Sequence, residues 1–391
     1  MRVMIFTDTY PPEINGVATS SRNLASVLRK NGNEVLVVTT NPFSKDVTYE
    51  EGILRIPGIE LTKLYGYRLA WLYNSKAMDV IRVFKGDVIH VQTDAGIGQF
   101  GYIVGRNLKI PTVYTYHTMY EEYTYYATKG HFDRVARNVV RLYTKSTIEK
   151  VDEFITPSQK TKDYLRSIGV DATINVVPTG IDFSIFKEES IDQEKLAQTK
   201  KELGINRDDI TILSLGRVAK EKSIDVCLKG FAEYVKQFPD AAAKFVIVGG
   251  GPALEGLIQL AKDLSIDKKV IFTGAVNPDI VPFYYRLGDV FISASITETQ
   301  GLTYMEAMAS DLIVLARFDN NLLGVINDNK TGFFFTDEND CAHQIDKIIH
   351  LTDEKRKEIV DKTKKTIEPF SFEAFYKNIM GVYLRAIKKS W

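Results

Sequence analysis

The stretch "TILSLGRVAKEKSID" (residues 211 to 225) contains the pattern that decides the fold. It begins with a short run rich in apolar and β-branched residues, which is typical of a buried strand. A polar segment follows and leads into a helical pattern with apolar residues at Ile224, Leu228, Phe231 and Val235. That spacing predicts a helix whose apolar stripe lies in the core. A strand, a loop and a helix in this order make up half of a βαβ unit.

The same alternation continues through both halves of the chain. The first half contains the strand-like runs "RVMIFT", "EVLVVTT", "DVIHVQ", "TVYTYH", "EFITPS" and "INVVPTG"; the second contains "TILSLG", "KFVIVGG", "VIFTGA", "DVFISAS", "LIVLAR" and "TGFFF". We therefore predict an α/β protein with two Rossmann-like, doubly wound domains. The expected domains are residues 1–182 and 183–370. Residues 371–391 are expected to form a terminal helix with Phe372, Phe375, Ile379, Val382 and Ile387 on its apolar face.

Length and composition exclude several classes of protein. A chain of 391 residues is long enough for two domains, and 50 Lys and Arg balance 50 Asp and Glu, so no global charge attracts nucleic acid. Cys227 and Cys341 are too few for a disulfide framework or a zinc site, which suits a reducing cytosol. We find neither a signal peptide at the start nor the ~20 apolar residues of a membrane span, so a soluble or peripheral protein is expected.

The balanced total conceals a basic, aromatic segment. Residues 61–150 carry 13 Lys and Arg against 7 Asp and Glu, a net charge of +6, and 11 of the 20 tyrosines together with Trp71. Tyr and Trp favour the depth of lipid headgroups, and basic residues are attracted to anionic lipid. This segment suits an anionic membrane surface.

The loops that follow the strands are the expected location of chemistry, since ligands of doubly wound sheets bind at the carboxyl ends of the strands. The first such loop, "DTYPPEINGVATSSRNLASVL", places Gly16 near the start of a helix. A glycine there lets backbone N–H groups approach a phosphate or a sugar, although it could equally be an ordinary turn residue.

The corresponding loops of the second half contain cations and glycines. Arg217 and Lys222 lie between a strand and a helix and can converge on an anion, unless they are simply solvated. "VIVGGGP" places Gly249 and Gly250 directly after a strand, where they open room for a ligand or make a tight turn. The absence of a GxGxxG pattern followed by a ribose-binding acid makes a dinucleotide site a weak hypothesis.

The stretch "TETQGLTYMEAMAS" (residues 297 to 310) places Glu298 and Glu306 eight positions apart around the predicted start of a short helix, 301–310. The N–H groups around Gly301, Leu302 and Thr303 would point at an anion. Charged residues near a helix start are common, but two carboxylates on either side of a phosphate site also suit the hydroxyls of a sugar and of a ribose. That arrangement predicts a nucleotide sugar.

Further candidates lie in the first half. "YTYHTMYEEYTYYATKG" contains His117, which could be structural but follows a strand, and Tyr120 and Glu121, which with Asp94 of "VQTDAGIGQ" are candidates for contacting an acceptor. The segment "HFDRVARNVVRLYTKS" has two helical faces. One is basic, and the other is apolar with Phe132, Val135, Val139 and Leu142; the basic residues are Arg134, Arg137, Arg141 and Lys145. Such a helix binds a membrane surface or presents a solvated side opposite a buried one.

With these motifs the sequence resembles the retaining glycosyltransferases of the GT4 family, which have the GT-B architecture of two Rossmann-like domains facing a cleft. The resemblance covers essentially the whole chain and rests on the E-x7-E pattern with "GLTYMEAMA", supported by "YPPEINGVA", "GRVAKEKS", "VIVGGGP" and "VPTGID". With "HTMYEEYTYY" the sequence looks most like bacterial diacylglycerol glucosyltransferases, although "RFDNNLLG" replaces a second glycine-rich turn of the family.

The resemblance implies roles for these residues. Glu298 would contact the donor sugar, Glu306 the ribose, and Arg217 and Lys222 the diphosphate. Gly16 would lie beside the donor and His117 would hydrogen-bond its sugar, and the terminal helix would cross back onto the first domain.

The predicted reaction is transfer of glucose from UDP-glucose to diacylglycerol with retention, as in a 1,2-diacylglycerol 3-glucosyltransferase, at the cytoplasmic face of the membrane. No D-x-D motif is present, so neither a metal nor another cofactor is expected, and the cations and the helix dipole would stabilise the leaving diphosphate. Four alternatives stay open: another sugar donor, a soluble acceptor, a sugar-nucleotide epimerase, and a membrane-associated module that only binds the nucleotide sugar.

Overall fold

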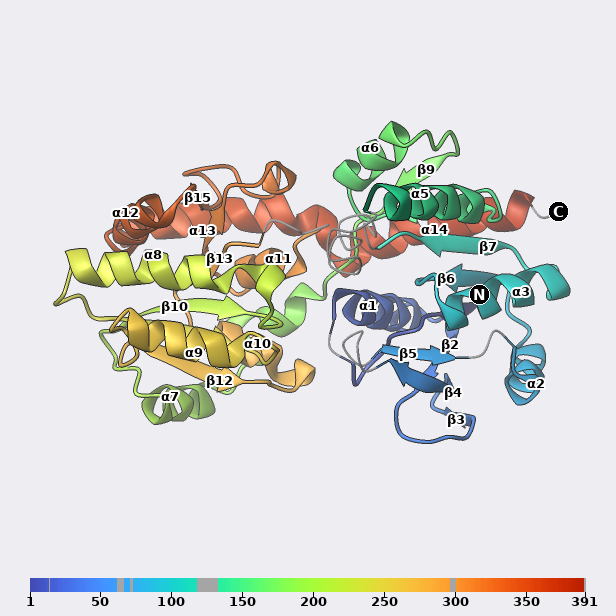
Figure 1. The fold of residues 1–391 in the computed structure, drawn as a ribbon, viewed down its shortest axis with the longest axis horizontal. Coiled ribbons are helices and arrows are strands. Elements are labelled where there is room, and N and C mark those ends of the chain that lie inside the picture. Colours follow the sequence, from blue (N-terminus) through green and yellow to red (C-terminus); the bar gives the residue numbers. More distant parts are fainter. Residues whose placement is uncertain (14, 62–66, 71–72, 118–132, 296–299, 390–391) are drawn as a thin grey trace. The chain divides into compact units, whose positions relative to one another are not determined.

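The protein forms two compact units, Met1–Gly180 with Phe372–Trp391, and Ile181–Ser371. The computed structural model describes residues 1–13, 15–61, 67–70, 73–117, 133–295 and 300–389 (Figure 1). Each unit contains a largely parallel sheet with helices packed against it, which confirms the predicted α/β class with two doubly wound domains. The chain passes from one unit to the other after Gly180 and again after Ser371. The sequence had predicted these boundaries after residues 182 and 370.

The sheet of the first unit has the strand order β3-β4-β2-β1-β6-β7-β8-β9. Its parallel strands are β1 (Arg2–Phe6), β2 (Glu34–Asn41), β4 (Ile53–Leu61), β6 (Val88–Val91), β7 (Thr112–Thr115), β8 (Glu153–Thr156) and β9 (Ile174–Val176). The short strands β3 (Thr48–Glu50) and β5 (Tyr67–Ala70) run antiparallel to β4. All six strand-like runs of the first half therefore form strands.

Alternate residues of each strand face different helices. Val3 and Ile5 of β1 pack with α1 (Gly16–Lys30) and α14 (Phe372–Lys389), whereas Met4 and Phe6 pack with α2 (Ser75–Phe84) and α3 (Gly96–Leu108). Period-two alternation thus builds a core on each side of the sheet. Helices α5 (Asp133–Ile148) and α6 (Gln159–Ser167) follow β7 and β8 along the chain.

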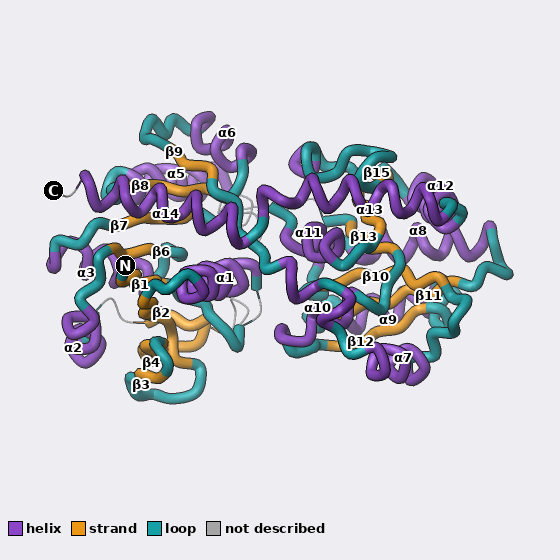
Figure 2. Tube along the Cα trace, turned by 180° about the vertical axis from the view of Figure 1, so that it is seen from behind, coloured by secondary structure: helices purple, strands orange, loops and turns teal. Residues whose placement is uncertain are grey.

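The terminal helix α14 belongs to the first unit, as the resemblance implied. It packs against β6, β7 and β8 of the sheet built by the start of the chain (Figure 2). Phe372, Phe375, Ile379 and Val382 are buried there. At its far end, Lys389 Nζ lies 2.8 Å from Glu153 Oε1, and the Arg385 guanidinium lies 3.7 Å from the same oxygen. The Glu153 side chain is only 2% exposed, so a buried carboxylate on β8 fastens the end of the helix.

Replacing Glu153 with Gln should loosen this attachment. The neutral amide loses the close ion pair with Lys389 and the longer one with Arg385, and a hydrogen bond to a charged group contributes ~1.5 to 3 kcal/mol. We expect the free energy of unfolding of the first unit to fall by about that amount in a urea titration. Glu149→Gln, which neutralises an exposed carboxylate nearby, is the matched control. Equal midpoints for the two variants would show that the contact adds no stability.

The sheet of the second unit is entirely parallel, with the order β12-β11-β10-β13-β14-β15. Its strands are β10 (Ile210–Leu215), β11 (Ala243–Val248), β12 (Val270–Gly274), β13 (Val290–Ser293), β14 (Ile313–Arg317) and β15 (Phe333–Phe335). Helices α8 (Ile224–Gln237), α9 (Leu254–Asp263) and α12 (Glu338–Ile349) share one core, and α10 (Val281–Tyr285) and α11 (Leu302–Ala309) share the other. Helices α7 (Gln193–Glu202) and α13 (Asp353–Ile367) complete the unit.

The apolar stripe predicted for the helix that is now α8 lies in the core, as expected. Ile224, Leu228 and Phe231 of α8 are buried, and Val235 is partly buried against the same core.

Candidate active site

In the first unit, the carboxyl ends of β1, β6 and β7 carry the predicted candidates. The three strands are neighbours in the sheet, so the loops after them lie along one edge. These loops hold Gly16, Asp94 and His117.

Gly16 is the first residue of α1 and faces open space. Asn15 caps the helix, since its side-chain oxygen accepts the N–H of Ala18 at 2.9 Å. A Cβ built on Gly16 would meet no protein atom within 4 Å. The fold therefore does not require glycine at this position, and exposed Gly16 leaves open space beside the start of the helix.

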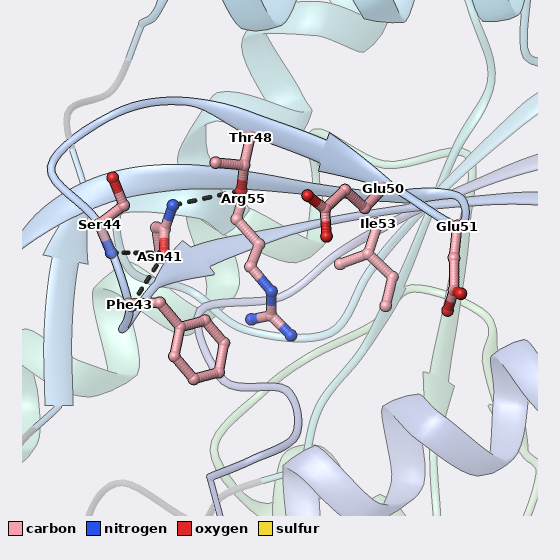
Figure 3. A pocket seen from close by; sticks show the side chains of 8 residues that line it. All are labelled: Asn41, Phe43, Ser44, Thr48, Glu50, Glu51, Ile53 and Arg55. Carbon is pink, nitrogen blue, oxygen red and sulfur yellow. Dashed lines mark hydrogen bonds between the residues drawn. The ribbon is translucent and has the colours of Figure 1, made fainter.

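A surface pocket lies beside the β3–β4 hairpin of the same unit (Figure 3). Its lining residues include Phe43, Glu50 and Arg55 but none of the residues predicted from the sequence. The Arg55 guanidinium donates to the carbonyl of Pro11 at 2.7 Å and lies over the ring of Phe43 at 5.3 Å. Arg55 thus tethers the loop that leads to Gly16.

His117 is held by a residue that the sequence had not indicated. Its Nε2 atom lies 2.7 Å from Oε1 of Gln92, a buried residue just after β6. Burial lowers the pKa of His117 to about 4, so the imidazole is neutral at neutral pH. An amide oxygen can only accept, so Nε2 carries the proton and donates it to Oε1 of Gln92. This leaves Nδ1 as a hydrogen-bond acceptor.

His90, two residues before Gln92, is structural. Its ring nitrogens lie 2.7 Å from the Tyr383 hydroxyl of α14 and from the Thr115 hydroxyl of β7. Burial, together with the charge of His117, lowers the pKa of His90 to about 3. His90 therefore links α14 to the sheet and stays uncharged.

Asp94 has an extensive set of partners. The Tyr114 hydroxyl donates to its carboxylate, and its backbone carbonyl accepts the Tyr143 hydroxyl of α5 at 2.9 Å. Burial and the charge of Asp94 raise the pKa of Tyr143 to about 12. These contacts give Asp94 a structural role; its contact with an acceptor stays a prediction.

Asp8, at the end of β1, was missed by the sequence analysis. Its carboxylate accepts the Thr93 hydroxyl at 2.6 Å and the N–H of Ile97 at 2.8 Å, at the start of α3. Burial raises the pKa of Asp8, while these bonds act in the opposite direction. Asp8 thus joins the loops after β1 and β6. An acid directly after a buried strand is the signal that could have identified it.

Several predicted residues lie outside the part of the chain that the structure describes: Trp71, Tyr120, Glu121, Glu298, and the side chains of Arg134 and Arg137. Their roles stay predictions. Helix α5 itself forms, with Arg141 exposed and Lys145 half-buried.

Leu142 departs from its expected environment. If the basic face of α5 is simply solvated, the opposite apolar face with Leu142 is expected to be buried. The Leu142 side chain is instead 69% exposed. The last two turns of α5 bury Thr144, Thr147 and Ile148 instead. Because 100° separates successive residues of a helix, Leu142 lies on the side opposite Thr144, near Lys145. This part of α5 presents an apolar residue among basic ones.

In the second unit, Arg217 and Lys222 lie in the loop between β10 and α8. The Arg217 guanidinium forms an ion pair with Glu221, and both side chains are partly buried. Glu221 therefore orients the guanidinium before any ligand binds. Lys222 ends a short 3-10 turn, Lys220–Lys222, beside this pair.

The glycines after β11 pack against this loop. A Cβ on Gly249 would lie 1.9 Å from the carbonyl oxygen of Gly216, so no other residue fits without backbone movement. Gly250 accepts the N–H of Val218 at 2.9 Å through its own carbonyl. The tight-turn interpretation is therefore supported, and donor binding by Gly249 and Gly250 stays a prediction.

The predicted short helix forms as α11, directly after Gly301. Gly301 adopts a left-handed conformation with φ of 73°, which favours glycine. Glu306 lies in the middle of the helix, and the Tyr285 hydroxyl donates to its Oε2 atom at 2.8 Å. Burial raises the pKa of Glu306, and the bond from Tyr285 partly opposes this shift. Leu302 and Thr303 form the first turn, as predicted.

Comparison with known proteins identifies the family. The model for Glycosyltransferase Family 4 matches residues 14–184, and the model for Glycosyl transferases group 1 matches residues 197–366. An alpha-monoglucosyldiacylglycerol synthase of Streptococcus pneumoniae is 38% identical over 99% of this chain and 86% of its own. The chain belongs to the GT4 glycosyltransferases.

A second curated relative and a solved structure are also similar to this chain. A second alpha-monoglucosyldiacylglycerol synthase, from Acholeplasma laidlawii, is 33% identical and covers the whole of this chain and 98% of its own. Among solved structures, Anabaena HepE in complex with UDP and glucose has a TM-score of 0.70 at 17% identity and covers 97% of this chain and 98% of its own. The fold is that of the GT-B glycosyltransferases.

Proposed function

We propose that this enzyme transfers glucose from UDP-glucose to the free hydroxyl of diacylglycerol, forming monoglucosyl-diacylglycerol. The observation that carries the proposal is the full-length similarity to two alpha-monoglucosyldiacylglycerol synthases, at 38% and 33% identity. The residues at the strand ends supply suitable chemistry in each unit.

The second unit would hold the nucleotide part of the donor. Arg217 and Lys222 would bind the diphosphate together with the N–H groups at the start of α11, and Glu306 would accept the ribose hydroxyls. Glu298 would contact the glucose.

The proposed chemistry is a same-face substitution that retains the configuration at the anomeric carbon. The bond from that carbon to the UDP oxygen breaks as the bond to the acceptor oxygen forms. The leaving phosphate oxygen takes the acceptor proton. Negative charge grows on the diphosphate during this step, so positioned cations stabilise the transition state more than the bound donor. The neutral imidazole of His117 would accept a hydrogen bond from a hydroxyl of the sugar.

The acceptor is a lipid, so we propose that the first unit binds the cytoplasmic face of the membrane peripherally. None of the described helices is both long and apolar enough to cross a bilayer. Ile59 and Leu69 are paired across β4 and β5 and are 61% and 45% exposed. Exposed apolar residues beside basic ones, as at Leu142 and Arg141, favour the lipid interface.

The test is to incubate the protein with labelled UDP-glucose or UDP-galactose and vesicles that contain diacylglycerol, and then to identify the products. Labelled monoglucosyl-diacylglycerol with an α-linkage supports the proposal. A galactolipid would overturn the donor, and labelled water-soluble glycoside without lipid product would overturn the acceptor. Conversion of the donor alone would indicate an epimerase.

Gly16→Ala gives a second test of the donor site. The added methyl group meets no protein atom, and Ala is favoured over Gly within a helix, so the free energy of unfolding should not fall. The methyl group would occupy space next to the N–H groups that the donor approaches, and we expect kcat/KM for UDP-glucose to fall by about tenfold, ~1.4 kcal/mol. The matched control is Gly256→Ala, because Gly256 lies inside α9 and also faces open space. Gly32→Ala would not serve, because Gly32 has φ of 75°. Unchanged kinetics for Gly16→Ala would place the donor elsewhere.

Membrane binding can be separated from donor binding. Changing Arg134, Arg137, Arg141 and Lys145 to Gln removes four charges, each worth ~1 kcal/mol near an anionic surface and screened beyond ~10 Å at 0.1 M salt. Sedimentation with phosphatidylglycerol vesicles should weaken by at least tenfold, while UDP affinity in solution stays the same.

If the quadruple variant still sediments as the wild type does, α5 has a solvated face. Ile59→Ser with Leu69→Ser would then test the β4–β5 ribbon, which Trp71 follows in the sequence. If neither set of changes reduces vesicle binding, the proposed peripheral contact through these surfaces is contradicted.

A further inference from the structure

Tyr285 is a buried residue that the proposed donor chemistry leaves unexplained. It is the last residue of α10 and is fully buried. Its ring packs edge-on or tilted against Phe186 at 5.8 Å and Phe291 at 6.0 Å between centroids. A tyrosine has few rotatable bonds, so these contacts fix the position of its hydroxyl.

The hydroxyl is directed at Glu306. It lies 2.8 Å from Oε2 of the carboxylate and 3.3 Å from the carbonyl oxygen of Thr303. A phenol has one proton to donate, and the shorter contact to a charged acceptor is the stronger one. The proton therefore goes to Glu306. Oε2 is held by this bond, and Oε1 accepts no hydrogen bond from the described residues.

From this geometry we infer that Tyr285 is a positioning residue for nucleotide binding, which fixes the rotamer of Glu306 so that its carboxylate can accept the ribose hydroxyls. This inference rests on the proposed function, because the ribose is that of the UDP-sugar. It adds a residue from a different element, 21 positions earlier in the sequence, to the donor site.

The electrostatic surroundings of Glu306 agree with this role. Burial disfavours the charged carboxylate and raises the pKa of Glu306, and the hydrogen bond from Tyr285 is the opposing influence. Beyond the end of α11, Asp311 pairs with Arg286, which follows α10, and with Lys364 of α13. Within the described part of the chain, Tyr285 is the titratable group that donates to the Glu306 carboxylate.

Tyr285→Phe tests the inference because it removes only the hydroxyl. The ring contacts with Phe186 and Phe291 are kept, so the fold should persist. We expect the dissociation constant for UDP, measured by calorimetry, to rise by about 5- to 10-fold, the loss of one hydrogen bond to a charged acceptor. Tyr304→Phe is the matched control. Tyr304 is also fully buried, packs on Phe291 at 5.7 Å and donates to Ser293 at 3.0 Å instead of to Glu306.

A pH series distinguishes this role from a purely structural one. Protonated Glu306 accepts fewer hydroxyl bonds, so UDP affinity falls as the pH falls through the pKa of Glu306. Without the Tyr285 hydroxyl that pKa rises, so the variant should lose affinity at a higher pH than the wild type. The ratio of the two dissociation constants should therefore grow towards low pH, and in this ratio the titration of UDP itself cancels.

A double-variant cycle completes the test. In a Glu306→Ala background, Tyr285→Phe should change UDP affinity by less than about twofold, since the group on which it acts is gone. A full 5- to 10-fold loss in that background, or a pH-independent ratio, would overturn the inference. If wild-type protein itself fails to bind UDP, the proposed donor is wrong; if it binds and Tyr285→Phe binds equally well, only the inference fails.

Discussion

Alanine in place of both Arg217 and Lys222 should lower kcat by about 100- to 1000-fold, the largest effect expected for any change in this protein. Removing a single preorganised group that stabilises developing negative charge costs a factor of ~10² to 10³. The two cations are assigned to the diphosphate, on which charge grows as the glycosidic bond breaks. The loss should therefore appear in kcat and in kcat/KM alike, as measured by glycolipid formation at saturating UDP-glucose.

Two controls accompany this prediction. Lys220→Ala removes an exposed cation from the same 3-10 turn and should leave kcat within about twofold of the wild type. Because Glu221 pairs with Arg217, the variant should also be made with Glu221→Gln, so that no partly buried carboxylate loses its counterion.

We propose that the cations, and not a metal ion, stabilise the leaving group. Turnover should then survive chelation. Loss of activity in EDTA that magnesium restores would contradict it, as would a higher KM with an unchanged kcat in the double variant.

Glu306→Ala should raise the dissociation constant of UDP by about tenfold or more. Its carboxylate is assigned to ribose hydroxyls that substrate and product share, and losing hydrogen bonds to a charged acceptor costs ~1.5 to 3 kcal/mol. Calorimetry with UDP measures this without an acceptor. A folded variant with wild-type affinity would remove the assigned role.

Glu298→Ala provides the contrast. Glu298 is assigned to the sugar, so this variant should keep its affinity for UDP and lose activity with UDP-glucose. Equal damage to both ligands would contradict the division of roles between the two glutamates.

The sequence predicted the parallel strands other than β4 because each of them is a compact apolar run. It missed the ribbon formed by β3, β4 and β5. Strand β4 contains Pro57 and Gly58, which normally interrupt a strand pattern. The structure places them where β4 stops pairing with β2 and starts pairing with β5, so Pro57 lies at the end of one ladder.

For the candidate site, local patterns indicated residues at helix starts and strand ends, including Gly16, Arg217 and Glu306. They did not indicate the side chains that hold such groups in place. Gln92 lies 25 positions from His117, and Tyr285 lies 21 positions from Glu306. Neither separation follows a helical or strand period, since only the folded topology brings these pairs together.

The return of α14 to the first unit has a consequence for synthesis on the ribosome. Every residue of the Ile181–Ser371 unit is translated before Phe372, so that unit can complete its folding first. The Met1–Gly180 segment, although made earlier, lacks the helix that covers Val3, Val113 and Ile155 until residues 372–389 have been translated. Its apolar sheet face is uncovered during that interval. The order in which the two units mature is therefore the reverse of the order in which their first residues emerge.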